Sequence, residues 1–108
     1  MFRKKKEIII KNQFDFTDDI DAMSDIVQKN TVESTEYFNK LLMFLTNPYP
    51  ENRIAACNAL GKTSRESAFT NISHWLQSEQ NPNVIDAMKK ALGNIRKNIN
   101  AEHQQNKF

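Results

Sequence analysis

The chain has 108 residues, 39% of them hydrophobic, which suits one domain with a single core and requires neither disulfides nor metal. It contains only two glycines and three prolines, which argues against an all-β sandwich and favours long helices joined by short turns. The one cysteine excludes an intramolecular disulfide and any zinc site built on two or more cysteines, and the net charge of +2 is nearly neutral.

The first sixteen residues are predicted to form an N-terminal arm, followed by a single helical domain over residues 17–108. Four basic residues at positions 3–6 precede the run Ile8 to Ile10. This apolar run is much too short for a signal peptide or a membrane span. We therefore expect a soluble, cytoplasmic protein without stable membrane anchoring.

The first helix is predicted at residues 18–29, with Thr17 as its N-cap. Residues 15–36 carry seven acids and one lysine. Acids in a first turn favour the helix dipole, whereas an EF-hand calcium loop needs a glycine and a glutamate at offsets that this segment lacks. We expect these acids to form a surface that faces solvent or a partner.

An internal repeat over residues 35–100 predicts two pairs of helices. Residues 52–61 resemble residues 84–93 at a spacing of 32, and both contain Ala-x-x-x-Ala-Leu-Gly. Upstream of each copy, apolar residues three and four positions apart predict a preceding helix. A weaker third copy begins at Ile20, 65 residues before Ile85. The first helix should therefore pack as a lone second helix on the first complete pair.

Prolines are expected to separate the two helices within each pair. The turns are Asn47-Pro48-Tyr49-Pro50 and Asn81-Pro82, where a residue without an amide donor suits a turn or a first helical position. With the lone first helix, the fold class is predicted to be all-α with about five helices.

The two glycines have different expected roles. Gly61 is predicted to end its helix in the left-handed conformation, and Thr63 or Ser64 to cap the next helix. Gly93 is predicted to lie inside a continuous helix, where it permits close packing. Residues 101–108 are expected to fray from the end of that helix.

The second helix of each pair resembles that of HEAT-like repeats of the phycobilisome-lyase type, whose pattern is Val-Arg-x-Ala-Ala-x-x-Ala-Leu-Gly. Six of seven specified positions match in the first copy, namely Arg53, Ala55, Ala56, Ala59, Leu60 and Gly61, and Asn52 replaces the valine. Five match in the second copy, where Ile85 replaces the arginine. The resemblance implies an α-α superhelix with the second helices on its concave side. It also implies a polar ladder from Arg53 to Asn47, which should be broken in the second copy.

No residue constellation in the sequence has the spacing of a catalytic or metal site. His74 and His103 are not spaced to act with Cys57 or a carboxylate. Cys57 lies within a repeat helix, where we expect a small packed residue and not a nucleophile. We therefore predict a protein that is not an enzyme and needs no cofactor or metal.

The favoured function is a protein–protein interaction module, acting as an adaptor or scaffold. The expected contact residues are solvent-facing positions of the second helices: Arg53, Asn58, Lys62, Asp86, Lys90, Asn94 and Lys97. Another protein is the expected partner. Self-association is also considered, because the acidic first helix and the basic last helix would allow head-to-tail pairing.

Two alternative functions remain open. The basic stripe of the last helix could bind nucleic acid; its residues are Lys89, Lys90, Arg96 and Lys97. The family resemblance also implies a possible accessory subunit of a lyase-like enzyme, although membership of a repeat family transfers no activity by itself.

Overall fold

The computed structural model describes residues 14–29 and 32–105, so most of the predicted N-terminal arm lies outside the described residues. The described part contains five helices and no strand: α2 (Thr17–Gln28), α3 (Val32–Phe44), α4 (Pro50–Leu60), α5 (Glu66–Leu76) and α6 (Pro82–Gln105). This confirms the prediction of an all-α fold with about five helices.

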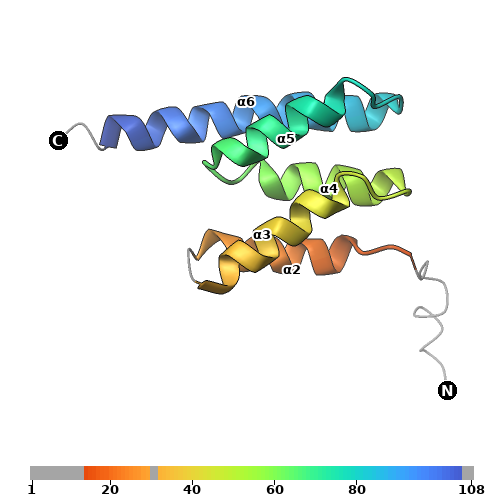
Figure 1. The fold of residues 1–108 in the computed structure, drawn as a ribbon, viewed down its shortest axis with the longest axis horizontal. Coiled ribbons are helices and arrows are strands. Elements are labelled where there is room, and N and C mark those ends of the chain that lie inside the picture. Colours follow the sequence, from red (N-terminus) through yellow and green to blue (C-terminus); the bar gives the residue numbers. More distant parts are fainter. Residues whose placement is uncertain (1–13, 30–31, 106–108) are drawn as a thin grey trace, which may run out of the picture.

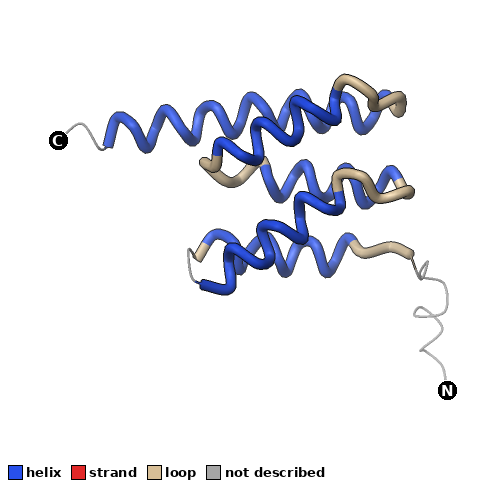
Figure 2. The backbone as a smooth tube through the Cα atoms, viewed as in Figure 1, coloured by secondary structure: helices blue, strands red, loops and turns tan. Residues whose placement is uncertain are grey.

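The helices lie in two layers (Figure 1). In one layer α2, α4 and α6 lie one above the other and run in the same direction, while α3 and α5 cross in front of them (Figure 2). Helix α4 packs against α2, α3 and α6, and α5 packs against α6. This packing fits the predicted superhelix, with α2 as the lone helix before two hairpins.

The core forms where the apolar faces of both layers meet. Phe38, Leu41 and Leu45 face inward from α3 and the following turn, at the three- and four-residue spacing of one helix face. Alanines at positions 56, 59, 87 and 91 are also buried, and their small side chains let α4 and α6 approach closely. Burying one large aliphatic side chain contributes about 1.5–3 kcal/mol.

The prolines begin helices as predicted, but the caps differ from the prediction. Pro50 and Pro82 are the first residues of α4 and α6. Thr17 is the first residue of α2 and not its N-cap, which is Phe16. The Asp15 carboxylate accepts hydrogen bonds from the Thr17 amide (2.9 Å) and the Thr17 hydroxyl (2.7 Å). The cap prediction for Thr17 is therefore wrong by one position.

The cap predicted for α5 is also wrong. Its N-cap position is Arg65, with no capping hydrogen bond from the Arg65 side chain, and neither Thr63 nor Ser64 occupies it. The Thr63 hydroxyl instead donates to the Leu60 carbonyl at 2.8 Å, so it satisfies the end of α4.

The two glycines differ from their expected roles. Gly61 has φ −64°, which is right-handed, so the left-handed prediction is wrong. A Cβ at Gly61 would lie 3.3 Å from the Cα of Ala91, so glycine is needed there for the close approach of α6. Gly93 lies inside α6 as predicted, but a Cβ added there would have nothing within 4 Å, so this glycine serves no close packing within the described residues.

Helix α6 continues past Gly93 because its apolar spacing continues. Ile95 is buried, Ile99 packs against the core, and the helix reaches Gln105, so fraying from residue 101 is not observed. The Arg96 guanidinium lies 4.6 Å from the centre of the Phe69 ring. Along the repeat, Arg65 and Phe38 make the same contact at 4.5 Å, 31 residues earlier.

Candidate functional site

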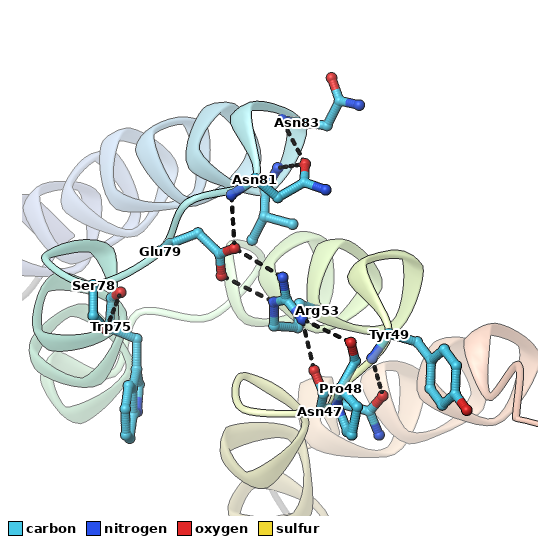
Figure 3. A network of polar contacts seen from close by, with 10 residues as sticks. Asn47, Pro48, Tyr49, Arg53, Trp75, Ser78, Glu79, Asn81 and Asn83 are labelled. Atoms are coloured by element: carbon cyan, nitrogen blue, oxygen red, sulfur yellow. Dashed lines mark hydrogen bonds and ion pairs between the residues drawn. The ribbon is translucent and has the colours of Figure 1, made fainter.

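A polar network joins the turn within the first hairpin to the turn within the second (Figure 3). At its centre Arg53 of α4 donates two hydrogen bonds to the Glu79 carboxylate, from Nε at 2.9 Å and from Nη2 at 2.8 Å. This bidentate geometry, with two parallel charge-assisted hydrogen bonds, is among the strongest interactions between an arginine and a carboxylate. It connects residues 26 positions apart and holds the second hairpin to the first.

The Arg53–Glu79 pair is largely withdrawn from solvent. Their side chains are 16% and 8% exposed, so Arg53 is not the solvent-facing residue that the sequence predicted. Burial alone would raise the pKa of Glu79, but hydrogen bonds from Arg53 and the Asn81 amide, with the positive charge of Arg53, outweigh it and lower that pKa. Glu79 is therefore an anion at neutral pH.

Arg53 is hydrogen-bonded to Asn47, the residue expected for the ladder, and the contact is made to the main chain of Asn47. Its Nη1 donates to the main-chain carbonyls of Asn47 (2.8 Å) and Pro48 (3.2 Å), not to the Asn47 side chain. The Asn47 side-chain oxygen instead accepts from the Tyr49 amide at 3.0 Å. Arg53 thus binds main-chain carbonyls of the turn between α3 and α4 through Nη1, while its Nε and Nη2 bind Glu79 in the turn between α5 and α6.

The second turn continues the network without an arginine of its own. Glu79 accepts a hydrogen bond from the Asn81 amide at 3.1 Å. The Asn81 side chain in turn accepts from the amides of Asn83 (2.9 Å) and Val84 (3.3 Å), which begin α6. The network therefore ends at the N-terminus of α6, in agreement with the absence of an arginine at position 85.

Sequence reasoning missed the role of Asn52, which it treated only as the residue in place of a valine. The Asn52 side chain is fully buried. It donates to the Phe14 carbonyl (2.7 Å) and to the Asn47 side chain (3.1 Å), and it accepts from the Phe16 amide (2.9 Å). A buried asparagine in a valine position was the available signal, because such a group requires partners.

A cavity of about 360 Å³ lies next to the Arg53–Glu79 pair. Trp75, at the end of α5, forms one side of it, and Leu45 and Thr46 at the end of α3 form another. Ser78 and Gln80 complete the rim. The cavity is lined by an aromatic side chain, an aliphatic side chain and an ion pair whose two members bind each other.

Most of the predicted contact residues do lie on the surface. We call Asn58, Lys62, Asp86, Lys90, Asn94 and Lys97 the α4–α6 stripe; all six are exposed. On α6 its members follow one another at spacings of four, four and three residues and so share one face. Lys90 and Asp86 form an ion pair at 3.2 Å, with side chains 74% and 65% exposed. Of the seven predicted contact residues, only Arg53 is largely buried.

The basic residues of α6 do not form one patch. Lys90 and Lys97 belong to the α4–α6 stripe, whereas Lys89 and Arg96 lie about 100° around the helix from them. Arg96 stacks on Phe69. The four charges are therefore divided between two faces.

Another cavity, of about 710 Å³, lies where the C-terminal part of α6 passes the turn between α4 and α5. Asn98 bridges this turn by donating to the carbonyls of Gly61 (3.1 Å) and Thr63 (2.9 Å). Ser64 is hydrogen-bonded to Glu102. Several polar groups of this cavity are thus used to attach α6 to the turn.

Cys57 and His74, which the sequence offered as possible catalytic or metal-binding residues, are placed as follows. Cys57 is buried, as expected for a packed residue, and burial raises the pKa of its thiol to about 12. His74 is exposed and lies edge-on to Trp75, with ring centres 4.7 Å apart. Residues 14–29 and 32–105 contain no group of three potential metal ligands. In the same ranges no helix is both long and apolar enough to cross a membrane.

Comparison with protein-family models finds no match, and comparisons with curated proteins and with solved structures find no significant match.

Proposed function

We propose that this protein is a non-catalytic protein–protein interaction module, an adaptor or scaffold of the cytoplasm built from HEAT-like helical pairs. The observation that carries the proposal is the α4–α6 stripe. Its six polar side chains are exposed: five lie on α4 and α6, which pack directly against each other, and Lys62 lies in the turn that follows α4. The fold is built by the opposite faces of these helices, so the stripe is available for another molecule.

The rigidity of the support favours recognition. The Arg53–Glu79 pair and the hydrogen bonds of Asn52 and Asn81 fix the turns at which α4 and α6 begin. Because the helices are held before binding, a partner would not have to supply the free energy of ordering them.

A protein partner is favoured over nucleic acid for two reasons. The basic residues of α6 are split between two faces, so few of them could follow one phosphate backbone. Lys90 also lies beside Asp86, whose charge would repel phosphate. Alternating charges and amides on a helix face suit a protein surface of complementary pattern.

The experiment compares the wild-type chain with Lys90→Glu plus Lys97→Glu. A matched control, Lys29→Glu plus Lys40→Glu, makes the same change in net charge at exposed residues outside the stripe. Proteins captured by each chain after nuclease treatment are identified by mass spectrometry. The affinity of each purified candidate is then measured at physiological salt.

The proposal expects a partner that binds the wild type and the control alike but binds the stripe variant more weakly, by about tenfold or more. It fails if every partner binds the stripe variant as tightly as the wild type. Fluorescence anisotropy with duplex and single-stranded DNA is the second arm. DNA binding at physiological salt that is lost in the stripe variant would replace the proposal with the nucleic-acid alternative.

A further inference from the structure

The stack formed by α2, α4 and α6 has two open ends. Helix α4 lies between α2 and α6, whereas α2 and α6 each have a neighbour of this layer on one side only (Figure 1). Within residues 14–29 and 32–105, no element covers the far side of either end helix.

The outer side of α6 has the same residue pattern as the side of α4 on which α6 packs. Gly61 of α4 lies against Ala91 of α6, and its missing side chain permits this close approach. Gly93 is the counterpart of Gly61, 32 residues later. It is two residues from Ala91, so it lies on the opposite side of α6, where it is exposed with nothing near it.

The outer side of α2 has a residue pattern similar to that of the side of α6 that packs on α4. Ala87 of α6 is buried, and its counterpart 65 residues earlier is Ala22 of α2, which is exposed. Ile26, the counterpart of buried Ala91, is only half-buried. The surface of α4 that receives α6 is therefore repeated on the outer side of α6, and the surface of α6 that packs on α4 is repeated on the outer side of α2. Within the described residues, neither outer surface is covered by another helix.

The open ends carry opposite charges at positions that are apolar inside the molecule. Asp19 on α2 is the counterpart of buried Val84, and Lys89 on α6 is the counterpart of buried Cys57. Both charged residues are exposed. Substitution of apolar residues by charges keeps each end soluble, and their opposite signs make the ends complementary.

Apolar surface adjoins both ends as well. Between α2 and α3, Met23, Met43 and Phe44 line a cavity of about 340 Å³, and Met43 is 73% exposed. Between α5 and α6, Phe69 and Ile99 line a cavity of about 240 Å³.

We propose that a second copy of this chain docks on α6, with its α2 lying against the Gly93 side as α6 lies against α4. Each contact uses the α2 end of one copy and the α6 end of the next, so the association is heterologous and can continue into a longer stack. This surface is centred on Gly93 and Lys89, which are not members of the α4–α6 stripe, although Asp86 and Lys97 of the stripe lie only about 20° and about 40° from Gly93 around the helix. A second copy is a different occupant from the partner proposed above, so the proposal goes beyond that function and does not depend on it.

The first test uses Gly93→Trp, with Asn94→Trp as its matched control one residue away on another face. A Cβ at position 93 meets no atom of the described residues, so the variant should fold, and replacing a helix-interior glycine favours the helix. Sedimentation velocity over a wide range of protein concentration measures the mass of each chain at low salt.

The wild type and Asn94→Trp should increase in average mass with concentration, and added salt should reduce this increase. Gly93→Trp should weaken the association by about tenfold or more, because the indole keeps the next helix from close approach. A wild type that stays monomeric at every concentration overturns the proposal. So does a folded Gly93→Trp variant that associates like the wild type.

The second test establishes which ends meet. Asp19→Lys and Lys89→Asp should each associate about tenfold more weakly than the wild type, because each places like charges in the contact. Mixed together, the two variants should associate again, since the unaltered α6 end of Asp19→Lys can bind the unaltered α2 end of Lys89→Asp, and the two exchanged charges are also opposite in sign. A mixture that remains monomeric refutes the head-to-tail arrangement.

Discussion

The Arg53–Glu79 pair allows a quantitative test of what holds the two hairpins together. Glu79→Gln removes the negative charge but keeps the size of the side chain, leaving the Arg53 guanidinium in a site where it is 16% exposed. Removing one partner of a buried ion pair costs about 3–5 kcal/mol. Arg53 keeps two carbonyl acceptors, so we expect the free energy of unfolding to fall by about 2–3 kcal/mol.

Chemical denaturation, followed by far-UV circular dichroism and by the fluorescence of the single tryptophan, measures this loss. Trp75 lines the same cavity as Arg53 and Glu79, so its signal reports the local contact as well as global unfolding. Asp86→Asn is the matched control. It breaks the exposed pair with Lys90 and should change the free energy by less than about 0.5 kcal/mol.

The pH dependence has a definite sign. The pKa of Glu79 is lowered on folding, so its stabilising contribution is complete above the ordinary value of 4.5 and is lost as pH falls through the lower folded value. The stability difference between wild type and Glu79→Gln should therefore shrink in acid. The reasoning is refuted if the variant loses less than about 0.5 kcal/mol at neutral pH, or if the difference is the same in acid.

Three further predictions use the same denaturation assay or thiol chemistry. Gly93→Ala should stabilise the chain by up to about 1 kcal/mol, whereas Gly61→Ala should destabilise it by about 1–3 kcal/mol because its methyl group meets Ala91; equal effects would contradict the assigned packing. Asn52→Ala should cost about 2–4 kcal/mol because it removes the partner of main-chain groups at Phe14 and Phe16, and a loss below about 1 kcal/mol would show that water replaces the amide. Cys57, with its pKa raised to about 12, should not react with a thiol reagent in the folded protein at mildly alkaline pH but should react on unfolding; rapid reaction of the native protein would contradict its burial.

The elements that sequence reasoning predicted well are those controlled by local spacing. The helix pairs follow from apolar residues at three- and four-residue intervals, and Pro50 and Pro82 begin helices because their rings suit a first helical turn. The caps were predicted less well. Thr63 does not occupy the N-cap position of α5: its hydroxyl donates to the Leu60 carbonyl at 2.8 Å and accepts from the amide of the N-cap residue Arg65 at 3.5 Å.

The candidate surface could be predicted in part. Positions such as Asn58 and Lys90 are exposed because polar residues occupy the face opposite the core, which the sequence pattern indicates directly. The burial of Arg53 could not be predicted in the same way. It depends on Glu79, which lies 26 residues later in a different turn.

The uneven charge seen in the sequence is clearer in three dimensions. The acidic and basic helices lie at opposite ends of one layer, with α4 between them (Figure 1). The sequence alone determined that the chain is helical, that its helices form two similar hairpins, and that acids and bases are separated along it, because these properties depend on neighbouring residues. Only the tertiary structure decided that Gly61 is covered while Gly93 is open, and that the side chains of Asn52 and Arg53 are hydrogen-bonded to residues distant in the sequence. Those outcomes depend on which groups meet across the space between helices.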